Sequence, residues 1–195
     1  MPKRPQRQRG RERVAALLQA GAAVFAERGY DAATMTEVAA RAGASIGSLY
    51  QFFPTKELLA AGVLQEYLDG VYRQLEDLAG RAGALPAAQL ADRLFGLLAA
   101  ARAAYPAFAA LVEGFGPLPA MTADIRKEMR RLIAAVLQAR APHLAPEALQ
   151  ALATATLQMM KAAAALDADA SVPGRKAALA ELQAMLRDYL AAQLS

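Results

Sequence analysis

Cysteine and tryptophan are absent from this chain of 195 residues, and His143 is its only histidine. The lack of cysteine excludes disulfide bonds, thiolate nucleophiles and cysteine-based metal sites. Long apolar runs are also missing: the longest, Leu94 to Ala101, ends at Arg102 and is far shorter than the roughly 20 residues of a membrane-spanning helix. No apolar segment of the secretory type follows the basic N-terminus. We therefore expect a cytoplasmic globular protein with no membrane partner, no metal and no cofactor.

Basic residues are unevenly distributed along the chain. Residues 1–60 hold nine Lys or Arg and five Asp or Glu, whereas residues 61–195 hold thirteen of each kind. The formal net charge of +4 therefore belongs to the first third, and residues 1–13 alone carry a surplus of five positive charges. A basic arm on a neutral body predicts contact with a polyanion, either nucleic acid or an anionic surface. A solvated tail is the alternative, because charge alone does not separate the two.

Apolar residues recur at helical spacing along almost the whole chain, and no segment alternates for long as a strand does. Proline and glycine divide this pattern into about nine helices, and abundant alanine raises helix propensity throughout. The sequence therefore predicts an all-α fold with an N-terminal domain in residues 1–60 and a second helical domain in residues 61–195. The helix-end signals of the first domain are the left-handed Gly29, the capping box of Thr34 and Glu37, and the capping residue Ser45.

Residues 35–53 have the spacing of a helix-turn-helix motif. Two helices that cross closely need a small residue at the crossing, which Ala39 supplies, and the turn between them needs a residue that tolerates positive φ, which Gly43 supplies. Leu49 is the apolar anchor that holds the outer face of the second helix toward a DNA groove. Each feature alone is weak in a chain rich in alanine and leucine. Together with the basic arm they indicate DNA binding.

A longer pattern surrounds this motif, beginning with an amphipathic helix that ends in FAERGY. Its members are Phe25-Ala26-Glu27, Gly29-Tyr30, Thr34, Val38-Ala39, Ala42-Gly43, Ser45, Gly47, Leu49-Tyr50, Phe53, Lys56 and Leu59. With these residues, Val14–Leu59 resembles the DNA-binding domain of the TetR/AcrR family of bacterial transcriptional regulators. The resemblance implies a three-helix N-terminal domain followed by a C-terminal helical domain for ligand binding and dimerisation. Two positions depart from the family pattern: Ala44 replaces the usual valine and Phe52 the usual histidine.

The resemblance implies that residues around the second helix of the motif contact double-stranded DNA. The residues expected in the major groove are Ser45, Ile46, Gly47, Ser48 and Gln51. Those expected at phosphates are Tyr50, Lys56, Thr34 and Thr36. Gln51 can pair with adenine through two hydrogen bonds, and Ile46 can touch a thymine methyl group. Simple helix capping is the alternative for Thr34 and Ser45, and a packed surface aromatic is the alternative for Tyr50.

Two apolar stripes near the end of the chain suit a symmetric four-helix interface between two copies, as the resemblance also implies. The residues expected in this homodimer interface are Leu149, Leu152, Thr156, Met160, Leu179, Leu182, Leu186, Tyr189 and Leu190. Packing within one chain must use part of the same faces. A dimer presents two recognition helices to half-sites about 34 Å apart, which predicts a roughly palindromic operator.

A pocket for a small-molecule effector is expected among the central helices. Its expected lining residues are Phe95, Leu98, Tyr105, Phe108, Val112, Phe115, Met121, Met129, Leu132 and Met159. Few charges lie on the apolar faces of these helices, so we expect a mainly hydrophobic ligand. Ordinary core packing is the alternative for each residue. Lys161 is expected either to meet an anionic group of the ligand or to extend from the surface.

The sequence therefore predicts a transcriptional regulator, most simply a repressor that a small hydrophobic ligand releases from its operator. The alternative is an architectural DNA-binding protein of the same fold that responds to no ligand, which a solid C-terminal core would favour. An enzyme is not expected, because the chain has one histidine, no cysteine, and no GxSxG, HExxH or glycine-rich phosphate loop.

Overall fold

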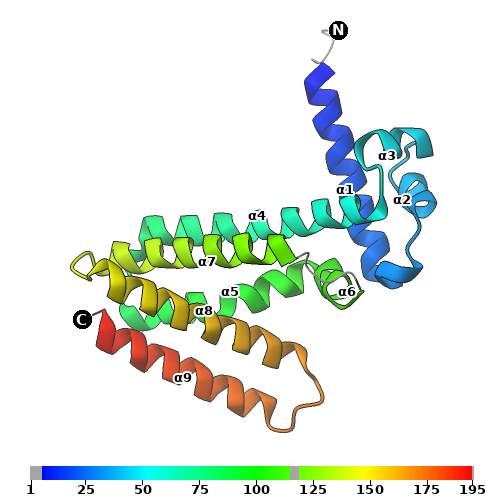
Figure 1. Cartoon of the computed structure of the whole chain (residues 1–195). Coiled ribbons are helices and arrows are strands. Elements are labelled where there is room, and N and C mark those ends of the chain that lie inside the picture. The colour runs from blue at the N-terminus through cyan, green and yellow to red at the C-terminus, as the bar shows by residue number, and fades with distance from the viewer. Residues whose placement is uncertain (1–5, 115–118, 195) are drawn as a thin grey trace. The chain divides into compact units, whose positions relative to one another are not determined.

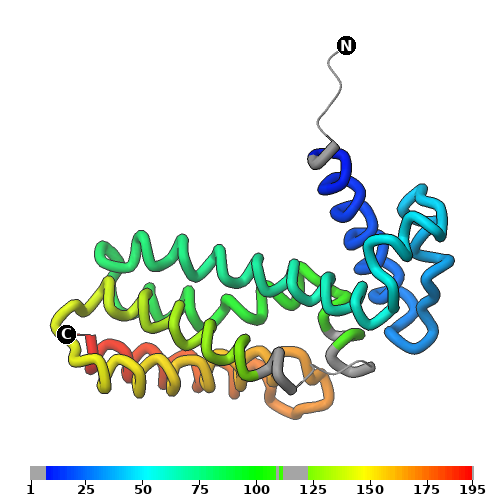
Figure 2. Tube along the Cα trace, turned by 45° about the horizontal axis from the view of Figure 1, so that its top comes forward, coloured from blue at the N-terminus to red at the C-terminus, as the bar shows by residue number. Residues whose placement is uncertain are grey.

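A computed structural model describes residues 6–114 and 119–194 of the chain (Figures 1 and 2). The helices over these residues are α1 (Gln6–Ala32), α2 (Met35–Arg41), α3 (Ile46–Phe52), α4 (Lys56–Ala82), α5 (Ala87–Ala104), α6 (Pro106–Gly114), α7 (Pro119–Arg140), α8 (Pro146–Ala168) and α9 (Arg175–Gln193). No strand occurs in the described part, so the predicted all-α fold is confirmed there. None of these described helices is both long and apolar enough to cross a lipid bilayer.

The chain divides into two compact units that differ from the predicted domains. The first unit contains α1, α2, α3, α4 as far as Leu68, and α6, while the second contains the rest of α4 with α5, α7, α8 and α9. The sequence predicted a boundary after residue 60, but α4 continues through that position. Helix α6 joins the first unit because Phe108 stacks on Tyr67 with ring centroids 4.1 Å apart, and Tyr105 meets Tyr67 edge-on at 5.7 Å.

The first unit is built around apolar side chains from its first four helices. Leu17, Phe25, Leu49 and Leu59, which come from α1, α3 and α4, are completely buried. Gly29 has φ 77° and ψ 170° and interrupts α1 near its end. Only glycine adopts this backbone region readily, so the predicted positive φ at this position is confirmed. The bend lets the chain turn back toward the start of α2.

The second unit is organised around α8, which contacts α5, α7 and α9. Figures 1 and 2 both show α8 and α9 side by side as a hairpin. Arg187 of α9 binds Asp92 of α5 through two hydrogen bonds, Nε to Oδ1 at 2.5 Å and Nη2 to Oδ2 at 2.8 Å. Gln183 adds a third hydrogen bond to Asp92 at 2.7 Å. The hydrogen bond from Arg187 and, to a smaller extent, the one from Gln183 hold the pKa of Asp92 below its ordinary value. The carboxylate that links α5 to α9 is therefore ionised at neutral pH.

Thr156 of α8 generates a prediction about stability. Its side chain is completely buried, and its hydroxyl has no hydrogen-bond partner among the described residues. An unpaired buried hydroxyl loses its hydrogen bonds to water and gains none. Thr156→Val, which replaces the hydroxyl by a methyl group, should therefore raise the free energy of unfolding by about 1 kcal/mol. Urea denaturation followed by circular dichroism measures the change.

Thr154 supplies the matched control for this substitution. It is exposed on the same helix, and its hydroxyl donates a hydrogen bond to the carbonyl oxygen of Gln150 at 2.8 Å. Thr154→Val should give no comparable gain, since the hydroxyl it removes is already paired and solvated. A loss of stability in Thr156→Val would contradict the interpretation of its hydroxyl as unpaired.

Candidate nucleic-acid interface

The capping box predicted at the start of α2 is present. The hydroxyl of Thr34 accepts a hydrogen bond from the backbone N–H of Glu37 at 3.2 Å. The carboxylate of Glu37 in turn accepts hydrogen bonds from the backbone N–H of Thr34 at 3.1 Å and from its hydroxyl at 2.8 Å. These hydrogen bonds from Thr34 hold the pKa of Glu37 below its ordinary value. The hydroxyl proton of Thr34 therefore serves the cap, while Thr36, in the first turn of α2, is exposed.

A tight turn joins α2 to α3, as predicted. Gly43 has a positive φ of 59°, and the backbone N–H of Ala44 donates to the carbonyl oxygen of Ala39 at 2.9 Å. Ser45 then caps α3, because its hydroxyl accepts a hydrogen bond from the backbone N–H of Ser48 at 3.2 Å. Both helices of the motif thus begin at the caps that the sequence indicated.

Helix α3 has one buried and one exposed face. Leu49 is completely buried, whereas Ile46 and Tyr50 are 41% and 47% exposed. Residues of a helix are about 100° apart around its axis, so Gly47 and Gln51 lie on the side opposite Leu49. Both are exposed, and the neighbouring Ser48 is half-buried. Four of the five residues expected at DNA bases are therefore exposed, and Gly47 and Gln51 share the face opposite Leu49.

Lys56 is placed differently from the other residues expected at DNA. Its ammonium nitrogen donates hydrogen bonds to the carbonyl oxygens of Tyr30, Asp31 and Ala33, at 2.9, 3.1 and 3.2 Å. The same nitrogen lies 4.6 Å from the centre of the Tyr30 ring. An ammonium group has three N–H donors, and protein groups occupy all three here. Local spacing could not predict these partners, because they lie 23 to 26 residues away in the chain.

Additional side chains are exposed in the first unit. Arg9 and Arg11 are exposed near the start of α1, which is helical from Gln6, so that part of the basic arm is an ordered extension of the helix. Phe52 at the end of α3 and Leu58 in the first turn of α4 are also exposed, by 39% and 52%. Phe52 was predicted only as a departure from the family pattern, and Leu58 was not predicted at the interface. Helical periodicity can identify exposed apolar positions only after the buried face is known.

The residues expected in a homodimer interface are mostly covered by their own chain. Those that are buried within the second unit are Leu149, Leu152, Thr156, Met160, Leu186 and Leu190. Leu179 and Leu182 are half-buried, and Tyr189 is 38% exposed. The buried six present no surface to a second copy. Periodicity identified an apolar face correctly, but that face packs on α5 and α7 as well as between α8 and α9.

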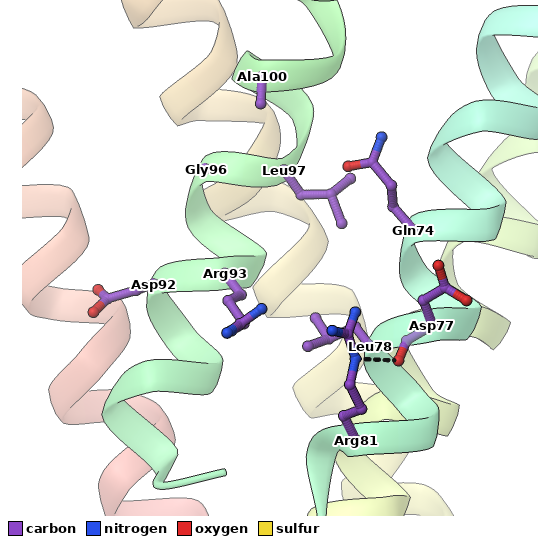
Figure 3. Close-up of a pocket in the computed structure, with 9 residues that line it drawn as sticks. All are labelled: Gln74, Asp77, Leu78, Arg81, Asp92, Arg93, Gly96, Leu97 and Ala100. Atoms are coloured by element: carbon purple, nitrogen blue, oxygen red, sulfur yellow. Dashed lines mark hydrogen bonds between the residues drawn. The ribbon is translucent and has the colours of Figure 1, made fainter.

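A groove of about 390 Å³ lies between α4 and α5 in the second unit (Figure 3). Its lining residues are Gln74, Asp77, Leu78, Arg81, Asp92, Arg93, Gly96, Leu97 and Ala100. Figure 3 shows Asp92 directed away from α4, consistent with its ion pair to Arg187. The groove is open and carries two arginines, so its chemistry differs from the hydrophobic pocket that the sequence predicted.

None of the residues expected to line an effector pocket lines this groove. Phe95, Met129 and Leu132 are buried, and Leu98, Tyr105, Phe108 and Met159 are half-buried. Tyr105 and Phe108 belong to the first unit, whereas Phe95, Leu98, Met129, Leu132 and Met159 belong to the second. Phe115 lies outside the described residues, as do the side chains of Val112 and Met121. Lys161 is exposed, and its ammonium donates to the side-chain oxygen of Gln158 at 3.4 Å.

Comparison with known proteins gives a consistent result over both parts of the chain. Residues 17–63 match the family described as bacterial regulatory proteins, tetR family, and residues 86–190 match the tetracyclin repressor-like C-terminal domain. The HTH-type transcriptional repressor KstR2 of Mycolicibacterium smegmatis is 44% identical over 66 residues, which cover 32% of this chain and 32% of that protein. The chain thus aligns with about a third of the length of this curated relative.

Solved structures share the fold over nearly the whole chain. A putative transcriptional regulator from Pseudomonas aeruginosa PAO1 superposes with a TM-score of 0.65 and 21% identity, covering 94% of this chain and 92% of that one. The regulator FadR from Bacillus subtilis, in complex with stearoyl-CoA, superposes with a TM-score of 0.63 and 14% identity, covering 88% and 96%. The C-terminal match alone covers more than half of the sequence. This chain belongs to the TetR family of bacterial regulatory proteins.

Proposed function

We propose that this protein is a DNA-binding transcriptional repressor that acts in the cytoplasm as a homodimer on a roughly palindromic operator. The observation that carries this proposal is the exposed face of α3, held outward by Leu49 in a helix-turn-helix with both caps in place. A helix held in this way can enter the major groove with its N-terminal residues toward the bases. Matches over the same segment to curated regulators, the repressor KstR2 and the activator FasR of Mycolicibacterium smegmatis, support DNA binding by this segment.

The side chains of α3 divide into two roles in this proposal. Gln51 projects opposite the buried Leu49 and can read adenine through its amide, while Ile46 can contact a thymine methyl group. Tyr50 contacts the phosphate backbone and fixes the register of the helix without reading sequence. Arg9 and Arg11, which are exposed on α1, add electrostatic attraction to phosphates.

Substitutions in α3 separate these two roles. Gln51→Ala should reduce discrimination at one base pair by about 1–3 kcal/mol, because it removes a bidentate contact. Tyr50→Ala should instead weaken binding to all sequences by a similar factor. Fluorescence anisotropy with DNA from the region upstream of the protein's own gene, and with single-base variants of the bound site, measures both effects.

Gln89→Ala is the matched control for these substitutions, because Gln89 is exposed on α5 in the second unit. It should bind DNA as the unsubstituted protein does. Unchanged affinity and unchanged base preference in both α3 variants would overturn the assignment of α3 as the recognition helix.

Exposed apolar stripes on α8 and α9 support the homodimer. On α9 the stripe has the alternating spacing of four and three residues that coiled-coil interfaces use: Ala178, Leu182, Met185, Tyr189 and Ala192. On α8 the corresponding residues are Ala148, Ala151, Ala155, Met159, Ala162 and Leu166. Met185 is 58% exposed in the single chain, which is unusual for a large apolar side chain at the centre of such a stripe. We place the interface on these stripes, which include the predicted Leu182 and Tyr189 but none of the six predicted residues that are buried.

The dimer proposal predicts that a charge at Met185 separates the subunits. Met185→Glu should give a monomer, because an unpaired carboxylate in an apolar interface loses its hydration. Ala180→Glu introduces the same charge at an exposed position away from the stripe and should stay dimeric. Size-exclusion chromatography with light scattering measures the mass. A monomeric unsubstituted protein, or a dimer of unchanged stability in Met185→Glu, would contradict the proposed interface.

We further propose that a small, mainly hydrophobic ligand releases the repressor from DNA. The stearoyl-CoA complex of a protein with the same fold makes fatty acyl compounds the first ligand class to test. Thermal-shift measurements with fatty acids and acyl-CoA thioesters of increasing chain length should reveal a stabilising ligand that also reduces DNA binding. Stable DNA binding in the presence of every compound would favour the alternative, a DNA-binding protein of this fold that responds to no ligand.

A further inference from the structure

The groove between α4 and α5 brings two arginines together from facing walls. Figure 3 shows Arg81 of α4 and Arg93 of α5 directed into the space between the two helices, and both side chains are exposed. We propose that this groove binds a small organic anion, with a carboxylate between the two guanidinium groups and an apolar body over the base of the groove. The inference goes beyond the proposed function, because it adds a site and a ligand class that the DNA-binding surface does not use.

Neither carboxylate of the groove neutralises the two arginines. Asp92 is directed away from α4, and its oxygens accept hydrogen bonds from Arg187 and Gln183. Figure 3 shows the carboxylate of Asp77 turned to the side of α4 that faces away from α5. The groove therefore holds two positive charges, and none of its described lining residues places a negative charge between them.

Both arginines keep N–H donors for a ligand. A guanidinium group has five N–H donors, and Arg81 uses the one on Nε for the carbonyl oxygen of Asp77 at 3.1 Å. This hydrogen bond holds the side chain along α4 and leaves its terminal N–H groups to the groove. Arg93 forms no hydrogen bond or ion pair with any described residue. Arginine does not lose its proton in proteins, so a bound anion, and not deprotonation, relieves the repulsion between the two groups.

A carboxylate is the anion that suits this arrangement. Its two oxygens match the fork of N–H donors on a guanidinium group, and such paired hydrogen bonds are stronger than those between neutral groups. Because two guanidinium groups enter the groove from different helices, one carboxylate can accept hydrogen bonds from both. An ammonium or other cationic ligand would add a third positive charge. The charge of the groove therefore selects an anion.

The remainder of the groove is apolar and lacks bulky side chains. Leu78 of α4 and Leu97 of α5 are buried at its base. Gly96 has no side chain, and a methyl group at that position would meet no atom within 4 Å. Ala100, one turn further along α5, is also small. The volume of about 390 Å³ lies at the lower end of the range of ligand pockets, so we expect a carboxylate on one ring or on a short aliphatic chain.

Benzoate is the probe that tests the site, because it joins a carboxylate to a ring without a flexible chain. The isotopically labelled full-length protein is titrated with benzoate, and its backbone amide signals are followed by NMR. The signals of Arg93, Gly96 and Leu97 should shift along one saturation curve, with a dissociation constant on the order of 1 mM for so small a ligand. Benzamide, the neutral isostere, should bind at least about tenfold more weakly, because it offers the guanidinium groups no charge.

Two substitutions separate the charged part of the site from the apolar part. Arg93→Gln removes one guanidinium group and should weaken benzoate binding by at least about tenfold. Gly96→Leu keeps both arginines but fills the space over the base of the groove, so it should also abolish binding. Leucine favours a helix more than glycine does, so this second variant should fold. Arg126→Gln is the matched control, because Arg126 is exposed on α7 and does not line the groove.

The two ligands and three variants give outcomes that decide the question. Saturable shifts at the groove that both Arg93→Gln and Gly96→Leu abolish, and that Arg126→Gln retains, support the anion site. Equal binding of benzoate and benzamide, unchanged binding in either groove variant, loss of binding in the control, or no shift at the groove would each overturn it. Failure of the unsubstituted protein to bind DNA would overturn the proposed function alone, because this titration contains no DNA.

Discussion

The burial of Leu49 is the contact on which the whole DNA-binding surface depends. Helix α3 has only seven residues, and a helix of that length does not persist in water without support from its surroundings. The completely buried Leu49 ties one face of α3 to the core of the first unit, and the Ser45 cap fixes its first turn. The opposite face of α3 is then not needed for packing. Its residues can therefore be selected for contact with DNA.

Charge in the first unit is used in two distinct ways. Arg9 and Arg11 are exposed and act at a distance, where salt screens them. Lys56 is half-buried and acts over hydrogen-bond distances on the protein's own backbone. Only the environment of each side chain distinguishes these two kinds of basic residue.

Local signals in the sequence predicted most of the helix-turn-helix, but they could not predict contacts between segments that are distant in the chain. The Thr34–Glu37 capping box and the positive φ of Gly43 involve residues within a few positions, and both are confirmed. The partners of Lys56 lie more than 20 residues away, so spacing could not indicate them. The residues predicted at the dimer interface are affected in a related way, since six of the nine are buried in their own chain while Leu179, Leu182 and Tyr189 remain partly accessible. Apolar periodicity on α8 and α9 identifies an apolar face, but only the packing of α5 and α7 determines that this face is internal.

The place of α6 in the first unit has a consequence for how the protein can be divided. The chain leaves that unit after Leu68, returns to it with α6, and then leaves again. A fragment that ends at residue 60 or 68 lacks α6, so the aromatic ring of Tyr67, if retained, loses its neighbours Tyr105 and Phe108. If operator specificity is exchanged between relatives by swapping N-terminal segments, each α3 is therefore combined with the α6 of the other protein. Because the first compact unit of this chain is formed from two separate stretches of sequence, we expect a chimera that keeps its contacts to need both stretches.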